Sequence, residues 1–205
     1  ADSVSYPVEV YPLPAANFSN STVCATFNTQ FIDSSNSGNV VSWLWDFGDG
    51  DTSTLQNPTH PYDTGGLYNV TLIASSGNGC MDSVNKPVEV YGLPSADFNA
   101  TNVCLADTSD FNYIPVITND SIVSWSWNFG DGDTSTLQNP SHAYANPGLY
   151  AVILIITSIN GCDTIAAKPV EVYSLPVADF SSSPACLNDI TIFTDLSTDS
   201  SGIIA

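Results

Sequence analysis

Hydrophobic and polar residues alternate in short stretches along the chain, and Gly, Pro, Asn and Asp separate these stretches. In "YNVTLIA", the side chains of Tyr68, Val70, Leu72 and Ala74 would all lie on one face of a β-strand. Successive side chains of a strand point to opposite faces, so this period of two indicates a strand with one buried face. The pattern therefore predicts an all-β protein.

Two other stretches show the same alternation. In "WLWDF", Trp43, Trp45 and Phe47 fall on one face, and in "PVEVY" a polar glutamate separates Val88 from Val90. Several short strands at regular spacing, with turn residues between them, are typical of a β-sandwich. We therefore expect the aromatic side chains to pack in the core of a sandwich.

The chain is internally repeated. The sequence "PVEVY" occurs at 7–11, 87–91 and 169–173, and the related segments "LPAANF", "LPSADF" and "LPVADF" begin at Leu13, Leu93 and Leu175. This recurrence predicts modules of about 80 residues. The expected organisation is the last strand of a preceding module at 1–11, complete modules at 12–92 and 93–174, and the start of a further module at 175–205. We expect the natural polypeptide to be longer.

Charge restricts the partners. The chain of 205 residues has 21 acidic residues, two lysines and no arginine, for a net charge of −19. Such a protein repels nucleic-acid phosphates and anionic lipids, so neither nucleic-acid binding nor direct membrane insertion is expected. Hydrophobic residues make up 43% of the chain, which is enough for packed cores. Few lysines and five regularly spaced cysteines favour an extracellular, cell-surface or secreted protein.

Three motifs together resemble a known family. The patterns W-x-W-[D/N]-F-G-D-G, N-P-[T/S]-H-x-Y and G-x-Y-x-V occur in that order in both complete modules. They are similar to the PKD (polycystic kidney disease) domain, and the tandem arrangement resembles arrays in secreted or surface adhesins of gliding-type bacteria. The resemblance implies immunoglobulin-like sandwiches in a head-to-tail rod, without catalytic residues or a bound cofactor.

The acidic motif allows two interpretations. Carboxylate oxygens are the ligands that Ca²⁺ prefers, so the motif could hold calcium; the candidate ligands are Asp46, Asp49, Asp51, Asp131 and Asp133. Alternatively, Gly and Asp form a tight turn. The spacing differs from that of an EF-hand, and Asn128 replaces Asp46 in the second module. The turn interpretation is therefore favoured.

His60 and His142 occupy equivalent positions in "NPTHPY" and "NPSHAY". A catalytic or zinc-binding histidine needs partners nearby, and the sequence shows none. We expect each histidine to make a structural hydrogen bond. Without a nucleophile-elbow serine or an arginine, an enzyme is not expected.

In the immunoglobulin-like sandwich that the resemblance implies, Cys24 and Cys80 would lie at opposite ends of the module. This arrangement favours a disulfide between modules, Cys24–Cys162, with Cys80, Cys104 and Cys186 bonded to modules outside the chain. Pairing within modules, Cys24–Cys80 and Cys104–Cys162, remains open, as does the absence of disulfides.

The remaining candidate sites are on the surface. N-linked glycosylation sequons begin at Asn17, Asn20, Asn69, Asn99 and Asn119. The tripeptides "DSV", "DSV" and "DTI" resemble an Asp-Ser/Thr-aliphatic motif for bacterial O-glycosylation, with acceptors at Ser3, Ser83 and Thr164. Ala151, Ile153 and Ile155 make the outward face of one strand apolar, which suggests a lateral contact with another chain or module.

These features predict a non-enzymatic extracellular stalk, adhesin or fibre of stacked modules cross-linked by disulfides. Its partners would be copies of itself or neighbouring modules, and surface glycans or proteins. The alternative is a polysaccharide- or protein-binding accessory region of a larger secreted hydrolase.

Overall fold

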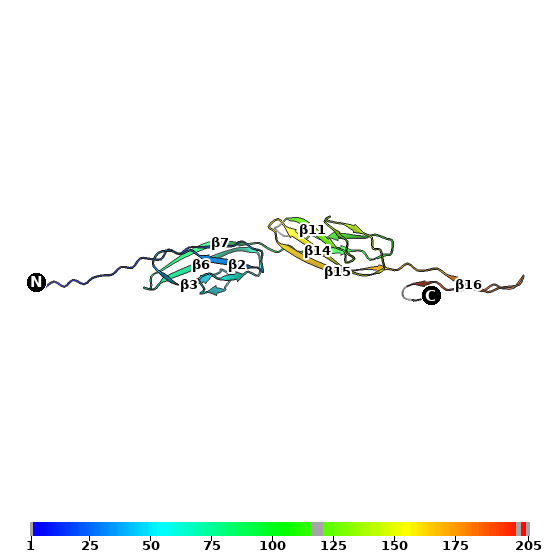
Figure 1. Ribbon diagram of the computed structural model, residues 1–205, viewed down its shortest axis with the longest axis horizontal. Helices are drawn as coiled ribbons and strands as arrows, with labels where there is room; N and C mark the ends of the chain where they lie inside the picture. Colours follow the sequence, from blue (N-terminus) through cyan, green and yellow to red (C-terminus); the bar gives the residue numbers. More distant parts are fainter. Residues whose placement is uncertain (1, 116–120, 200–201, 204–205) are drawn as a thin grey trace. The chain divides into compact units, whose positions relative to one another are not determined.

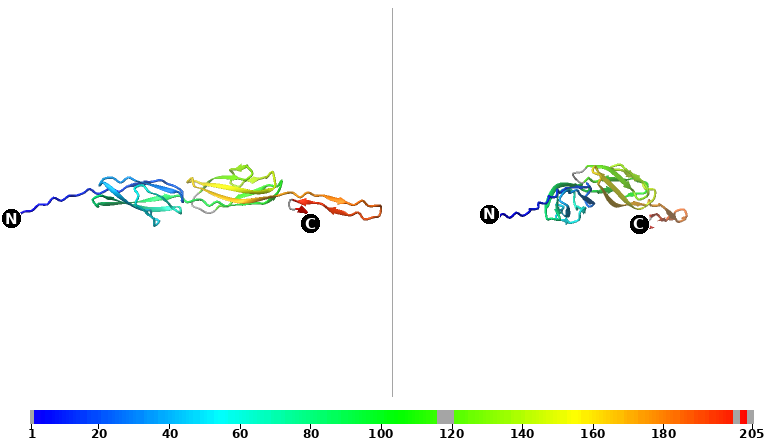
Figure 2. Two further views of the ribbon diagram at one scale, coloured as in Figure 1. Left: turned by 60° about the horizontal axis from the view of Figure 1, so that its bottom comes forward. Right: turned by 60° about the vertical axis from the view of Figure 1, so that its left-hand side comes forward.

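The computed structural model describes residues 2–115, 121–199 and 202–203, and all regular secondary structure in this part of the chain is β-strand. The chain divides into two compact units. One comprises Ala1–Leu93 together with Asn160–Cys162, and the other comprises Pro94–Ile159 and Asp163–Ala205. The strands can be followed in Figure 1 and in the two views of Figure 2.

The first module contains two sheets. Its strands are β1 (Phe18–Asn20), β2 (Asn28–Asp33), β3 (Val40–Asp46), β4 (Thr52–Ser53), β5 (Thr59–Pro61), β6 (Gly66–Ser76) and β7 (Met81–Val90). One sheet has the order β1-β2-β5 and the other β4-β3-β6-β7, with antiparallel pairing throughout these seven strands. The two sheets form a β-sandwich.

The core of this sandwich is aromatic. Trp45 is fully buried, and the rings of Phe18 and Phe31 lie 5.2 Å and 5.5 Å from its ring. Phe47 is also buried, and Trp43 packs against the edge of the same cluster. Burial of such rings is the main favourable term in folding. The sandwich and its core were predicted from the alternation, and both are confirmed.

The second module repeats this arrangement. Its strands are β8 (Phe98–Ala100), β9 (Val103–Cys104), β10 (Ser109–Tyr113), β11 (Ile122–Asn128), β12 (Thr134–Ser135), β13 (Ser141–His142), β14 (Gly148–Ser158) and β15 (Asp163–Tyr173). The sheets have the orders β13-β10-β8 and β12-β11-β14-β15-β9, and the short pairing of β15 with β9 is parallel. Trp127 takes the place of Trp45 in the core.

Both lysines lie at equivalent positions in the last long strand of each module. Lys86 Nζ donates to the carbonyl of Phe18 and, over 2.6 Å, to Oδ1 of Asn17. Lys168 Nζ donates to the carbonyl of Phe98 and pairs with Asp97 over 2.6 Å. Each ammonium group also lies over the ring of that phenylalanine. The two lysines therefore fasten the first strand of each module to its last, a role that the sequence did not reveal.

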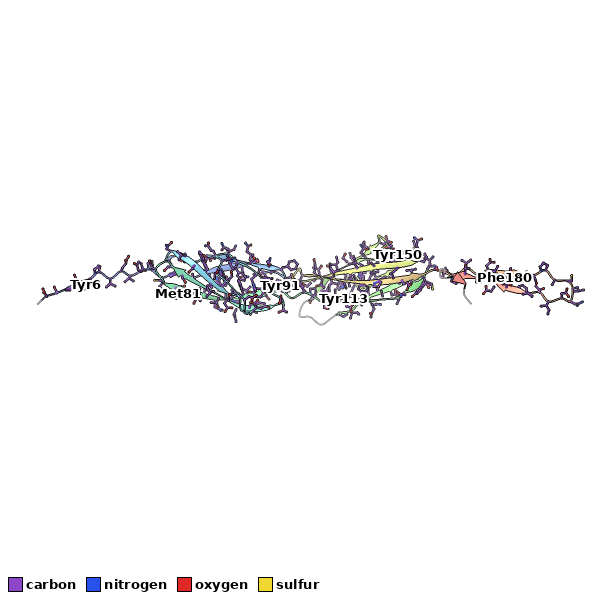
Figure 3. All side chains as sticks on the ribbon, turned by 90° about the horizontal axis from the view of Figure 1, so that it is seen from below. Tyr6, Met81, Tyr91, Tyr113, Tyr150 and Phe180 are labelled. Carbon is purple, nitrogen blue, oxygen red and sulfur yellow. A yellow bond between two sulfur atoms is a disulfide. The ribbon has the colours of Figure 1, made fainter. Side chains whose placement is uncertain are left out.

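The terminal segments differ from the modules. Residues 2–11 form no strand with the described residues, and Tyr6, labelled in Figure 3, is 83% exposed. A β-strand needs a neighbour that accepts and donates its backbone hydrogen bonds. The assignment of residues 1–11 to the last strand of a preceding module therefore stays a prediction. The C-terminal region contains the hairpins β16 (Phe180–Ser182)–β17 (Phe193–Asp195) and β18 (Thr198–Asp199)–β19 (Gly202–Ile203).

Candidate functional site

The acidic motif of the first module forms a turn held by its own carboxylates. Asp46 Oδ1 accepts a hydrogen bond from the Gly48 N–H over 2.9 Å, and Asp49 Oδ1 accepts one from the Asp51 N–H over 3.1 Å. The backbone N–H of Phe47 also donates to the carbonyl of Asp51. Short polar side chains commonly close turns in this way.

The second module explains why Asn128 can replace Asp46. Asn128 Oδ1 accepts from the Gly130 N–H over 2.9 Å, at the same distance as in the first module. This position needs an acceptor oxygen and not a charge, so an amide and a carboxylate are equivalent there. Asp131 and Asp133 repeat the second bond of the turn over 3.1 Å.

His60 lies beside this turn, although the sequence suggested no partner for it. Its Nε2 lies 2.6 Å from Asp49 Oδ2, and its ring stacks on Phe47 at a centroid distance of 4.2 Å. His142 and Asp131 repeat the pair over 2.7 Å. The expectation that each histidine makes a structural hydrogen bond is therefore confirmed. The sequence did not identify the acidic partners, because the fold brings together residues eleven positions apart in both modules.

The pKa values of titratable groups at this turn differ from their ordinary values. Burial by itself would raise the pKa of Asp49, but hydrogen bonds from His60 and from the Asp51 N–H outweigh it and hold this pKa below its ordinary value. The pKa of Asp131 is lowered in the same way. Tyr144 donates to the carbonyl of Phe129, and burial raises the pKa of Tyr144 to about 12.

The residues fit calcium poorly. Asp49, Asp51 and His60 bring one ligand atom each within 4.8 Å of one another, as do Asp131, Asp133 and His142. However, both oxygens of Asp49 already accept hydrogen bonds, and Asp46 is engaged with Gly48. Calcium takes six to eight oxygen ligands, which two carboxylates and an imidazole do not supply. The geometry favours the turn, and calcium binding stays an untested prediction.

We expect Asp49→Asn to cost about 1 kcal/mol of stability at pH 7, because the charged acceptor of the His60 bond is lost. The folded-state pKa of Asp49 lies below its unfolded value, so its contribution is present above about pH 4 and disappears as the pH falls through the folded-state pKa. Urea unfolding between pH 2 and pH 7 measures this difference. Asp46→Asn is the matched control, because Asn128 already occupies the equivalent position. Equal effects of the two variants would contradict the assignment.

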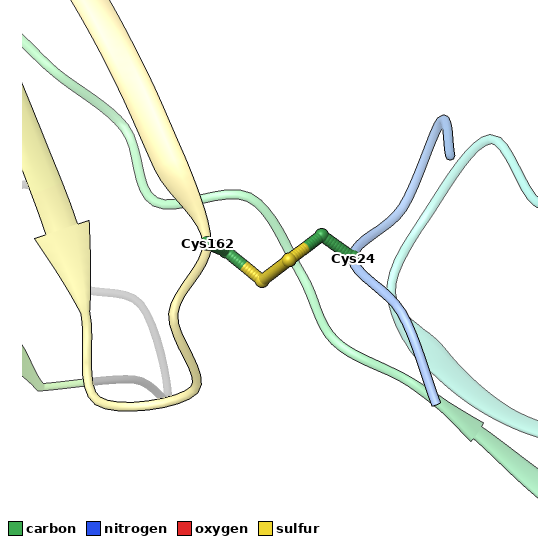
Figure 4. Close-up of a disulfide and its surroundings, with 2 residues drawn as sticks. All are labelled: Cys24 and Cys162. Carbon is green, nitrogen blue, oxygen red and sulfur yellow. A yellow bond between two sulfur atoms is a disulfide. The ribbon is translucent and has the colours of Figure 1, made fainter. Parts of the chain in front are cut away.

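The structure contains a disulfide between Cys24 and Cys162, with Cα atoms 5.7 Å apart (Figure 4). Cys24 precedes β2, and Cys162 ends the turn between β14 and β15. The alternative pairs Cys24–Cys80 and Cys104–Cys162 are not formed, since Cys80, Cys104 and Cys186 are free. Cys24 and Cys80 lie far apart along the strands of the first module, and Cys104 and Cys162 lie far apart along those of the second. The disulfide therefore joins one repeat of the sequence to the next.

A difference in strand register changes the accessibility of one candidate O-glycosylation site. Ser3 and Ser83 are exposed, whereas the hydroxyl of Thr164 is buried and has no hydrogen-bond partner among the described residues. Thr164 pairs with Ile156 and Ser83 with Ile73, so "DTI" is shifted by one residue relative to "DSV". A shift of one residue turns a strand side chain to the other face. The hydroxyl of Thr164 is therefore inaccessible in the folded module, and O-glycosylation at this residue stays an untested prediction.

The sequons differ in accessibility. Exposed side chains head three of the described sequons, Asn17, Asn69 and Asn99, and Asn20 is partly buried. The carboxamide oxygen of Asn17 accepts from Lys86. Asn119 lies outside the described residues.

The outward face of β14 and β15 is apolar. Ile153 pairs with Ala167, and Ile155 pairs with Ile165, which is 63% exposed. The equivalent face of the first module is more polar although it retains Ile73, and there the side chain of Asn85 donates to Thr71 over 2.8 Å. We call the apolar residues on this side of the two strands the outer apolar face. They are Leu149, Ala151, Ile153, Ile155, Ile165, Ala167 and Pro169. The residues proposed for lateral contact lie on it.

The comparisons with known proteins concern the repeated modules. The family model of the PKD domain matches residues 10–90 and 92–172. Among the described residues there is no helix that could cross a membrane.

Several curated relatives are enzymes with matching segments. The pre-pro-metalloprotease PrtV of Vibrio cholerae is 37% identical over 89 residues, which is 42% of this chain and 10% of the protease. A microbial collagenase of Vibrio alginolyticus is 42% identical over 60 residues, which is 29% of this chain and 7% of the collagenase. The chain thus matches only a tenth or less of the length of these relatives.

Two solved structures are similar to one module each. The PKD1 domain of Vibrio anguillarum Epp is 26% identical and covers 40% of this chain and 99% of its own, with a TM-score of 0.38. The PKD1 domain of the Vibrio cholerae metalloprotease PrtV is 33% identical and covers 39% and 99%, with a TM-score of 0.37. Since the family model matches both modules over most of the chain, the protein belongs to the PKD domain family and carries two of these domains in tandem.

Proposed function

We propose that the chain is a non-enzymatic structural segment of an extracellular stalk, adhesin or fibre, in which PKD modules follow one another head to tail. The observation that carries this proposal is the Cys24–Cys162 disulfide, because it joins one end of a repeat to the opposite end of the next, as a head-to-tail array requires. The acidic turns support it, since their carboxylates hold backbone and histidine groups. A net charge of −19 keeps such a surface hydrated.

The positions of the free cysteines fit the same pattern of disulfides between successive modules. Cys104 pairs in register with Tyr173 as Cys24 does with Tyr91, so both occupy the same place in their modules. Cys80 follows Gly79, whose φ of 82° matches the 78° of Gly161 before Cys162. We therefore assign Cys80 and Cys104 to disulfides with modules before and after these two, and Cys186 to the same role. Non-reducing peptide maps of the natural protein would show these pairs, whereas a Cys104–Cys186 bond would contradict the rule.

An accessory region of a larger secreted hydrolase is the second candidate. Its support is that the relatives are a metalloprotease and collagenases. In this role the modules would bind a polysaccharide or protein, and surface glycans or proteins are also the partners that an adhesin would need.

One experiment separates the two roles. The oxidised 205-residue chain is incubated with insoluble cellulose, chitin and collagen, and the bound fraction is measured after sedimentation. A stalk or fibre is expected to stay in the supernatant at all concentrations. Saturable retention on one of these materials would contradict the stalk or fibre role and favour a binding role, either as an adhesin or as an accessory region.

We also propose that the outer apolar face packs against a copy of the module or a neighbouring module. Changing Ile153 and Ile155 to Thr, the residue type present at Thr71 of the first module, should lower self-association several-fold without changing the melting temperature. Both side chains are only partly buried, so little core packing is lost. Sedimentation velocity at rising concentration measures the effect. Unchanged association would exclude this face, and Thr71→Ile with Asn85→Ala tests it in the opposite direction.

Calcium is expected to have no specific effect. Millimolar Ca²⁺ should raise the melting temperature no more than Mg²⁺ does, because the Asp49 oxygens are already occupied. Thermal unfolding with each cation measures this, and a calcium-specific rise that Asp51→Asn abolishes would show that the turn binds the ion.

Glycosylation at Ser3, Ser83 or the exposed sequons remains a proposal for the natural protein. An intact mass equal to that of the polypeptide would exclude it.

A further inference from the structure

The disulfide changes the covalent path between the ends of the chain. Cys24 and Cys162 are separated by 138 positions in the sequence. The loop that they close contains every strand from β2 to β14. Only β1 of the first module and β15 of the second lie outside the loop, on the direct path from the N-terminus through the disulfide to the C-terminus.

We propose that the Cys24–Cys162 disulfide carries tension past the parts of both sandwiches that lie between these two cysteines. A force applied to the two ends is transmitted through covalent bonds, and the shortest covalent path crosses the disulfide. Residues 25–161 cannot be drawn out while that bond is intact. This inference deepens the proposed structural role, which supplies the tension, but the mechanical property itself depends only on the bond.

The local structure supports both attachment points. Next to Cys24, the Ala25 N–H donates to the carbonyl of Tyr91 over 2.7 Å, and the Tyr91 N–H donates to the carbonyl of Val23 over 3.0 Å. These bonds tie the bridged residue to the end of β7. At the other end, Cys162 is fully buried. Tension therefore reaches the bond through residues that are fixed to the fold.

The segments outside the loop would yield first. β1 has three residue pairs with β2, from Phe18↔Asp33 to Asn20↔Phe31. Pulling on the N-terminus can separate this strand, but the separation must stop at Cys24. Similarly, β15 can separate from β14 up to Cys162. Phe18 of β1 and Val170 and Val172 of β15 would leave their cores, whereas Trp45, Trp127 and the other core residues stay inside the closed loop.

Reduction of the disulfide would allow the residues inside the closed loop to extend. The thiolate of an added dithiol attacks one sulfur of the bond, a mixed disulfide forms, and the other cysteine leaves as a thiolate. The second thiol of the reductant then displaces the first cysteine, so that the reductant is oxidised and both cysteines are reduced. Residues 25–161 could then extend under the same force.

Single-molecule force spectroscopy tests the proposal on the 205-residue chain held at its two ends, after its free thiols have been alkylated and the Cys24–Cys162 peptide has been mapped. At about 3.3–3.6 Å per extended residue, the separation of 138 positions predicts that the oxidised chain stops roughly 45–50 nm short of the Cys24→Ser variant. The matched control, Cys104→Ser, removes an equivalent but free cysteine and should keep the short length.

Addition of a dithiol during pulling should allow the two modules to unfold, and their unfolding should take the chain from the short length to the long one. Equal final lengths for the oxidised chain and Cys24→Ser, or extension of residues 25–161 before the reductant is added, would overturn the proposal. Retention on cellulose, chitin or collagen would contradict the stalk or fibre role and leave this result unaffected, so the two failures can be distinguished.

Discussion

Cys24→Ser is expected to lower the free energy of unfolding by about 4 kcal/mol, because the unfolded chain regains the entropy that a closed loop of this length removes. The loop spans a separation of 138 positions, and the entropic effect rises with loop length. Urea unfolding followed by tryptophan fluorescence measures the change, since Trp45 and Trp127 are fully buried in the folded modules.

The loss of the bond must be separated from the effect of a serine at this place in the fold. Cys104→Ser provides the comparison, because Cys104 pairs in parallel with Tyr173 as Cys24 does with Tyr91 and is not bonded. We expect Cys104→Ser to change stability by less than about 0.5 kcal/mol. If it costs as much as Cys24→Ser, the entropic explanation is wrong. Under reducing conditions the wild type and Cys24→Ser should become equally stable.

The sequence predicted the sandwich well, because alternation is read from neighbouring residues. Trp43 and Trp45 share one face of β3, Phe47 follows the strand directly, and Trp45 and Phe47 are buried where the alternation places them. The repeat added a second test of each position. Asn128 replaces Asp46 without changing the turn, which shows that the motif is maintained for its hydrogen bonds.

The contacts that the sequence did not reveal depend on the three-dimensional fold. Asp49 and His60 meet because the turn after β3 lies beside β5, and nothing in either segment specifies that approach. The one available signal was that the same pair recurs at the same separation as Asp131 and His142. The burial of Thr164 depends on register, since the similar tripeptides at Ser83 and Thr164 differ by one position along the strand.

Gly48→Ala is expected to cost about 3 kcal/mol, the sum of two effects of similar size. The φ of Gly48 is +81°, a left-handed conformation that is unfavourable for residues with a Cβ atom. In addition, a Cβ atom at this position would lie 2.7 Å from the carbonyl oxygen of Asn69, so the turn or β6 would have to move. Because β6 is a central strand of its sheet, such a movement would disturb the packing of the core.

Gly79→Ala separates the two effects. The φ of Gly79 is +82°, almost the same as that of Gly48, but a Cβ atom there has nothing within 4 Å. It should cost only the conformational term, about 1–2 kcal/mol. The second module offers the same comparison, because Gly130 would place a Cβ atom 2.8 Å from the Ala151 carbonyl and Gly161 is open. If both pairs show the same difference in urea unfolding, the glycine after the tryptophan strand is required by close approach of the backbone to the neighbouring strand. Equal losses at Gly48 and Gly79 would instead show that backbone conformation alone explains this glycine.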